Sequence, residues 1–125
     1  MAEILVIDDE SDITEVIQLY LEESNHQLKC FSSATEGLEW SKTNEVDLLI
    51  TDILMPDGIN GLELIADIRE FRPNVKILAI SGGGESGGIV KAMALETAIE
   101  LGAENALSKP FTKDELVRRV DKLLK

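Results

Sequence analysis

The sequence predicts one α/β domain, a three-layer, doubly wound (βα)5 arrangement with helices on both faces of a parallel five-stranded sheet. Five short apolar runs alternate with five segments of helical spacing along the 125 residues. The runs are aliphatic and β-branched with few charges, which is typical of strands buried on both faces. Right-handed crossovers between parallel strands then place helices on both faces of the sheet.

Composition fits one domain and excludes several classes of protein. The chain is 44% hydrophobic but only 4% aromatic, so its core must be mostly aliphatic. Its formal net charge of −12 repels nucleic acid and anionic lipid, and we expect neither as a direct partner. Cys30 is the one cysteine, which excludes a disulfide framework and suits a reducing, cytoplasmic compartment. We expect no signal peptide and no membrane span.

The first half of the chain contains two strand–helix units and a third strand. The run Glu3–Ile7 is the first strand, and the helix expected at Asp12–Glu23 has acidic residues in its first turn, which suit the helix dipole. A shorter strand follows at Gln27–Phe31. A capping box opens the helix expected at Ser33–Thr43. The third strand, Leu48–Thr51, is apolar, bounded by polar residues and too short for a helix.

The remaining elements are expected in a fixed order: a helix at Gly61–Phe71, a strand at Val75–Ile80, a helix at Ile89–Leu101, a strand at Asn105–Ser108 and a last helix opened by a capping box at Thr112–Glu115. Pro73 ends the first of these helices, and Gly102 is the expected stop of the second. The glycine-dense loop Gly82–Gly88 lies between the fourth strand and its helix. This loop lacks the Lys-Ser/Thr pair of a P-loop.

Polar residues follow four of the predicted strands. They are Asp8 and Asp9 after the first strand, Asp52 after the third, Ser81 after the fourth and Lys109 after the fifth. The carboxyl ends of parallel strands open on one edge of a sheet, where ligands bind in open α/β folds. Four separate elements thus bring three carboxylates, a hydroxyl and an ammonium to one edge. A turn aspartate and a solvated surface lysine are the alternatives for single residues in this set.

These groups suit phosphoryl transfer assisted by a divalent cation. Three carboxylates in one cleft repel each other, and Mg²⁺ relieves this repulsion because it prefers oxygen ligands. A carboxylate such as Asp52 can act as the nucleophile and form an aspartyl phosphate. The transfer then needs mainly positioning and charge neutralisation. The Lys109 ammonium can neutralise phosphate oxygens, and Ser81 can donate a hydrogen bond to them. Lys109–Pro110 is a candidate cis peptide bond.

In this combination the sequence resembles the receiver domain of two-component response regulators, over essentially all of residues 1–125. The resemblance rests on Asp8-Asp9, Asp52 followed by Met55-Pro56, Gly61-Leu62-Glu63, Ser81 and Lys109-Pro110-Phe111. It implies a flavodoxin-like sheet of order 2-1-3-4-5. It also implies a signalling switch that is not an enzyme, beyond catalysing its own phosphorylation and dephosphorylation.

The resemblance assigns a role to each site residue. Asp52 would be the phosphoacceptor, phosphorylated by a sensor histidine kinase or a phosphotransfer protein. Mg²⁺ would be bound directly by Asp9, Asp52 and the backbone carbonyl of Leu54, and mostly through water by Asp8. Ser81 and Lys109 would contact the phosphoryl group. An output protein would bind the face formed by the fourth helix, the fifth strand and the fifth helix.

The chain departs from the usual receiver pattern in its expected switching region. Ala106 stands where receivers usually carry tyrosine or phenylalanine, and the stretch from Ser81 to Lys109 is several residues longer than usual. We therefore expect Gly82–Gly88, rather than a rotating ring, to respond to phosphorylation. The last helix ends near Lys125, so no output domain is expected within the chain.

Two alternative functions remain open. A pseudo-receiver would bind partners without being phosphorylated, but the complete set of site residues argues against it. A phosphatase of the haloacid dehalogenase type would also use an aspartate at a strand end with Mg²⁺. Such enzymes usually carry a second aspartate two residues later, where Leu54 stands, and a cap for which this chain has no room.

Overall fold

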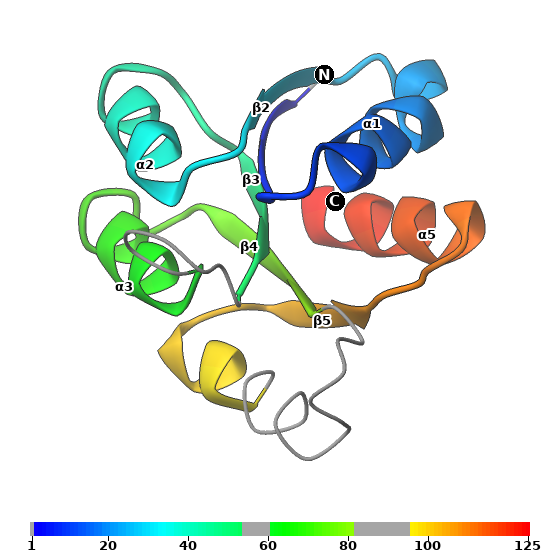
Figure 1. Cartoon of the computed structure of the whole chain (residues 1–125). Coiled ribbons are helices and arrows are strands. Elements are labelled where there is room, and N and C mark those ends of the chain that lie inside the picture. Colours follow the sequence, from blue (N-terminus) through cyan, green and yellow to red (C-terminus); the bar gives the residue numbers. More distant parts are fainter. Residues whose placement is uncertain (1, 54–60, 82–95) are drawn as a thin grey trace.

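The computed structural model describes residues 2–53, 61–81 and 96–125 (Figure 1). Its five strands form one parallel sheet in the order β2-β1-β3-β4-β5, which confirms the predicted α/β fold and its strand order. The strands are β1 (Glu3–Ile7), β2 (Gln27–Phe31), β3 (Leu48–Asp52), β4 (Lys76–Ser81) and β5 (Asn105–Ser108).

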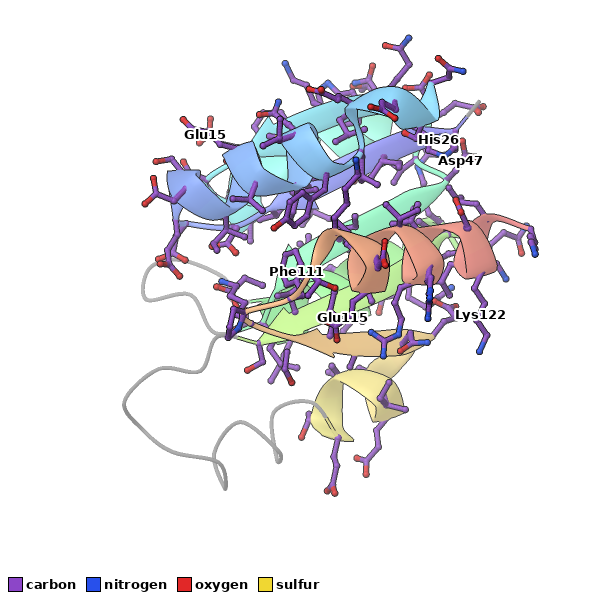
Figure 2. The ribbon with its side chains drawn as sticks, turned by 90° about the vertical axis from the view of Figure 1, so that its right-hand side faces the viewer. Glu15, His26, Asp47, Phe111, Glu115 and Lys122 are labelled. Carbon is purple, nitrogen blue, oxygen red and sulfur yellow. The ribbon has the colours of Figure 1, made fainter. Side chains whose placement is uncertain are left out.

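Helices cover both faces of the sheet. They are α1 (Ser11–Tyr20), α2 (Ala34–Thr43), α3 (Gly61–Phe71), α5 (Lys113–Leu124) and an unlabelled helical stretch at residues 96–101. In Figure 1, α2, α3 and the yellow stretch at 96–101 lie on one face, and α1 and α5 lie on the other. Figure 2 looks onto the second face, where α1 and α5 pack together. None of the helices within the described ranges has the length and apolar character that a membrane crossing needs.

The core divides into two aliphatic clusters, one on each face of the sheet. Alternate residues of β1 show the division: Leu5 and Ile7 belong to the cluster under α2 and α3, whereas Ile4 and Val6 belong to the cluster under α1 and α5. All five residues of β3 are buried, which places this strand at the centre of the molecule. The central strand therefore brings its last residue, Asp52, to the middle of one sheet edge.

Several predicted element boundaries differ from the structure, and the contacts explain three of them. The first helix ends at Tyr20 instead of Glu23, because a short 3-10 turn follows and Asn25 adopts a left-handed conformation with φ 65°. Asp52 and Ser81 lie inside their strands, since Asp52 pairs with Ile80 and Ser81 with Ser108. The predicted segments 54–60 and 82–95, including Leu54, Gly82–Gly88 and most of the fourth helix, lie outside the described residues.

The capping box predicted at the start of α5 is present. The Thr112 side chain accepts a hydrogen bond from the Glu115 amide at 3.1 Å, and the Glu115 carboxylate accepts one from the Thr112 amide at 2.9 Å. Thr112→Ala should therefore lower the free energy of unfolding by about 1 kcal/mol, as measured by urea denaturation. Thr35→Ala, at an exposed position in the first turn of α2, is the matched control and should change stability by much less. Equal losses in the two variants would contradict the capping role.

Candidate functional site

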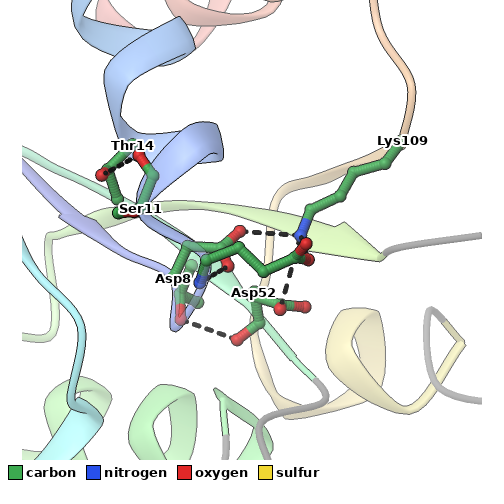
Figure 3. A network of polar contacts seen from close by, with 7 residues as sticks. Asp8, Ser11, Thr14, Asp52 and Lys109 are labelled. Carbon is green, nitrogen blue, oxygen red and sulfur yellow. Dashed lines mark hydrogen bonds and ion pairs between the residues drawn. The ribbon is translucent and has the colours of Figure 1, made fainter. Parts of the chain in front are cut away.

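The candidate site lies where three strands end at one edge of the sheet (Figure 3). Asp52 is the last residue of β3, Asp8 directly follows β1 and Lys109 directly follows β5. All three side chains are buried, with exposed fractions of 1% for Asp8, 5% for Asp52 and 8% for Lys109. Burial of three charged groups together is unusual unless they are paired or hold an ion.

A local turn brings a further carboxylate into this group. Oδ1 of Asp8 accepts a hydrogen bond from the backbone amide of Glu10 at 2.9 Å, which bends the chain immediately after β1. The exposed Glu10 side chain then lies close to the buried pair, with its Oε1 atom 3.4 Å from Nζ of Lys109. The chain between β1 and α1 thus contributes two carboxylates to the site.

The Lys109 ammonium lies among all three carboxylates. Its Nζ atom is 2.7 Å from Oδ2 of Asp8, 3.4 Å from Oε1 of Glu10 and 3.5 Å from Oδ2 of Asp52. The contact with Asp8 is an ion pair, although the Oδ2 atom makes no hydrogen bond of regular geometry. The Lys109 amide also donates to the carbonyl of Ser81 at 2.9 Å, which fixes this backbone against the end of β4. The next peptide bond, Lys109–Pro110, is cis.

Burial and ion pairing shift the pKa values of two site residues, Asp8 and Lys109. Burial raises the pKa of the Asp8 carboxyl, and the Lys109 ammonium and the Glu10 amide offset only part of this rise. Burial alone would lower the pKa of Lys109, but attraction to Asp8, Asp52 and Glu10 outweighs it, so the pKa of Lys109 is raised. The raised pKa of Lys109 reflects the three carboxylates that face its ammonium, whereas the raised pKa of Asp8 reflects its burial.

The three carboxylates lie close enough together that they could hold one metal ion. One carboxylate oxygen from each of Asp8, Glu10 and Asp52 lies within 4.8 Å of the other two. Carboxylate oxygens are the ligands that Mg²⁺ prefers, and a divalent cation would neutralise the charge that Lys109 leaves unbalanced. The donor set therefore fits Mg²⁺.

Ser81 is the fourth buried polar residue of this edge. It ends β4 and its exposed fraction is 0%. Among the described residues, its Oγ atom has no hydrogen-bond partner. Buried hydroxyls are nearly always hydrogen-bonded, so the Ser81 hydroxyl can still donate a hydrogen bond. It lies at the end of β4, where the Ser81 carbonyl accepts a hydrogen bond from the Lys109 amide. An anion bound at the edge would be a suitable acceptor.

The residues predicted from the sequence are thus partly assembled. Asp8, Asp52 and Lys109 come together, but the Asp9 side chain is exposed and does not belong to the carboxylate group. A metal-binding role for Asp9 stays a prediction, as does the role of the Leu54 carbonyl, which lies outside the described residues. Glu10 was missed. The signal that could have found it is the Asp8 side chain, because an aspartate before a turn commonly binds the amide two residues later.

The raised pKa of Lys109 leads to a prediction about alkaline stability. A folded-state pKa above the ordinary value of 10.5 means that its ion pairs stabilise the fold fully below that pH. This stabilisation is lost as the pH rises through the folded-state pKa. In the presence of a chelator, the free energy of unfolding should therefore fall more steeply above about pH 10.5 in the native protein than in Lys109→Met. Urea titrations across this range measure both slopes, and equal slopes would contradict the assignment.

Comparison with known proteins agrees with this geometry. The chain matches the family described as "Response regulator receiver domain" over residues 4–121. The response regulator SaeR of Staphylococcus aureus (strain USA300) is 27% identical over 124 residues. That match covers 99% of this chain and 51% of SaeR, so the chain spans about half the length of this curated relative.

Solved structures show the same likeness. A response regulator receiver domain protein from Clostridium thermocellum is 31% identical with a TM-score of 0.85, covering 99% of this chain and 94% of that one. The receiver domain of NtrX from Brucella abortus is 28% identical with a TM-score of 0.86, covering 97% of each chain. Both alignments extend over nearly the whole chain, site included.

Proposed function

Because this chain belongs to the response regulator receiver domain family, we propose that Asp52 is the phosphoacceptor of a Mg²⁺-dependent phosphorelay switch. Receivers are modules of two-component signalling and do not turn over a substrate. One observation carries the proposal: a buried carboxylate at the end of the central strand lies 3.5 Å from a buried ammonium and beside two further carboxylates. These groups can supply the positioning and charge neutralisation that phosphoryl transfer needs.

The chemistry at Asp52 is a phosphoryl transfer. A carboxylate oxygen of Asp52 forms a bond to phosphorus as the bond between phosphorus and the donor breaks. When the donor is a phosphohistidine, the electron pair of the broken bond stays on the imidazole nitrogen. Lys109 lies 3.5 Å from Asp52 and would neutralise the oxygens of the transferred group. Ser81, whose hydroxyl has no partner among the described residues, would donate a hydrogen bond to them.

The metal would be held at the acidic end of this site. Asp8, Glu10 and Asp52 are the described residues that fit it, with Asp9 and the carbonyl of Leu54 as the predicted additions. When bound, Mg²⁺ would shield the charge of the attacking carboxylate and of the phosphoryl oxygens. Lys109 pairs with the same three carboxylates, so Mg²⁺ bound there would compete with its ion pairs.

The proposed partners follow from the family. A sensor histidine kinase or a phosphotransfer protein would donate the phosphoryl group, and neither nucleic acid nor a membrane is proposed as a direct partner. An output protein would bind the face that includes the stretch 96–101, β5 and α5. Two side chains on that stretch support an interface there, since Ile99 is 46% exposed and Leu101 is 37% exposed.

One experiment separates this function from its two alternatives. The protein is incubated with acetyl phosphate, with and without Mg²⁺, and its intact mass is measured. A receiver gains one phosphoryl group, stable in acid and labile in base, only when Mg²⁺ is present. A pseudo-receiver gains none. A phosphatase releases phosphate continuously, and either of these two results would overturn the proposal.

The metal site is tested by calorimetric titration with Mg²⁺. Because the site has few protein ligands, Asp9→Asn should abolish binding that is detectable at millimolar Mg²⁺. Asp12→Asn is the matched control, since Asp12 is exposed in the first turn of α1, and it should bind Mg²⁺ like the native protein. Glu10→Gln is compared in the same series. Normal binding by Asp9→Asn together with a loss in Glu10→Gln would contradict the role predicted for Asp9.

A further inference from the structure

A second polar network lies away from the acidic site, at the end of α3. The guanidinium of Arg69 donates from Nη1 to the carbonyls of Pro73 at 2.9 Å and Val75 at 2.7 Å. From Nη2 it donates to the carbonyl of Gly102 at 2.6 Å and to Oε1 of Glu104 at 2.8 Å. One side chain of α3 thus holds both the loop that leads into β4 and the turn that leads into β5.

Glu104 extends this network to the sheet. Its second carboxylate oxygen accepts the amide hydrogen of Ile77 at 2.6 Å, and its own amide donates to the Ile77 carbonyl at 3.0 Å. Residue 104 is therefore attached to β4 through both its backbone and its side chain. The β5 strand begins at the next residue, Asn105.

The turn that leads into β5, at Gly102 and Ala103, also ends the helix at residues 96–101. Gly102 has a φ of +123°, which favours glycine, and its amide donates to the carbonyl of Ile99. The amide of Ala103 donates to the carbonyl of Ala98, and both alanines are buried in the core beneath α3. Arg69 then binds the Gly102 carbonyl, one of the backbone acceptors that a helix end leaves without an intrahelical partner.

We propose that Arg69 and Glu104 form an anchor that ties the C-terminal end of the helix at 96–101 to α3 and β4, and keeps that end in place when the acidic site is occupied. The tie to α3 and β4 is independent of the proposed function, whereas its persistence on occupation of the site rests on that function.

The anchor differs from an ordinary surface ion pair in the same protein. Arg69 and Glu104 are 25% and 31% exposed and bind four backbone groups in addition to each other. Lys42 and Glu39 of α2 also form an ion pair, at 2.7 Å, but are 51% and 64% exposed. Exposed pairs of this kind contribute little. Lys42 therefore supplies a matched control.

Amide hydrogen exchange tests the tie to α3. In Arg69→Met, the amides of residues 102–104 should exchange roughly tenfold faster or more, because several charge-assisted hydrogen bonds are lost together. The amides of β1 should keep their native rates, and Lys42→Met should behave like the native protein throughout. Glu104→Gln is a milder variant, should Arg69→Met not fold, and should accelerate the same amides to a smaller extent. Native rates at 102–104, or an acceleration shared equally by β1, would overturn the anchor.

A second arm tests whether the anchor persists. With Mg²⁺ and beryllofluoride, a phosphoryl mimic, exchange at residues 102–104 of the native protein should stay within about twofold of its unliganded rate. A larger change there would overturn the proposal. If beryllofluoride does not bind, as judged by unchanged exchange around Asp8 and Asp52, the proposed function is contradicted. The Arg69→Met and Glu104→Gln comparisons need no mimic and still decide whether the anchor exists.

Discussion

The Asp52→Asn variant is expected to take up no phosphoryl group from acetyl phosphate in the presence of Mg²⁺. An amide is a poor nucleophile, so the rate should fall by on the order of 10³-fold or more, as it does when other covalent nucleophiles are removed. The variant should still fold, because Lys109 keeps its 2.7 Å ion pair with Asp8. The substitution also removes one negative charge from a site that holds an excess of it. Intact mass measured over time gives the rate.

Asp47→Asn is the matched control for this variant. Asp47 immediately precedes β3, so it lies at the opposite end of the same strand and at the opposite edge of the sheet (Figure 2). Its Oδ2 atom accepts a hydrogen bond from the amide of Glu3, which ties it to the start of β1. This variant should be phosphorylated at the native rate. Loss of phosphorylation in both variants, or in neither, would contradict the role of Asp52.

Gly61→Ala is expected to disturb both the fold and the site. Gly61 begins α3, and a Cβ atom placed there would overlap the carbonyl oxygen of Asp52 and lie 2.5 Å from the Cα atom of Ile53. These are backbone atoms, so the end of β3 must shift. We expect the free energy of unfolding to fall by about 2–3 kcal/mol. A displacement of about 1 Å at the nucleophile should also slow phosphorylation on the order of 10²-fold.

Gly37→Ala shows whether such losses follow from any added methyl group. The Cβ atom at Gly37, in α2, would meet mainly the flexible end of the Ile7 side chain. The better helix propensity of alanine, about 1 kcal/mol, should offset most of the cost of moving that side chain. Phosphorylation should be native in this variant. Urea denaturation and the rate of mass gain are measured for both, and native behaviour of Gly61→Ala would show that helix α3 does not approach Asp52 so closely.

The fold could be predicted because its signals are local. Apolar runs such as Leu48–Thr51 identify buried strands without knowledge of their partners, and the rule for parallel strand ends then brings Asp8, Asp52 and Lys109 to one edge. The capping box at Thr112 was likewise readable, because both of its partners lie within one turn. The composition predicted an aliphatic core, and in the part of the chain that the structure describes the largest fully buried side chains are all isoleucine or leucine.

The remaining features depend on tertiary geometry that local patterns do not contain. Asp52 and Ser81 lie within strands because neighbouring strands continue to pair beside them. Glu10 joins the site only through the turn made by Asp8, and its contact with Lys109 spans 99 residues of sequence. The contact between Arg69 and Glu104 spans 35 residues in the same way. Side-chain contacts between distant segments follow from the assembled fold, so sequence periodicity cannot supply them.

The location of the phosphoryl group tests the central claim most directly, because a failed variant could also reflect a lost metal site. Native protein is phosphorylated with acetyl phosphate and Mg²⁺, digested in acid and analysed by tandem mass spectrometry. We expect one added phosphoryl group, on the peptide that carries Asp52 and on that carboxylate, and none when Mg²⁺ is removed by a chelator. A phosphoryl group on any other residue, or equal labelling without Mg²⁺, would contradict the assignment of Asp52 as the phosphoacceptor.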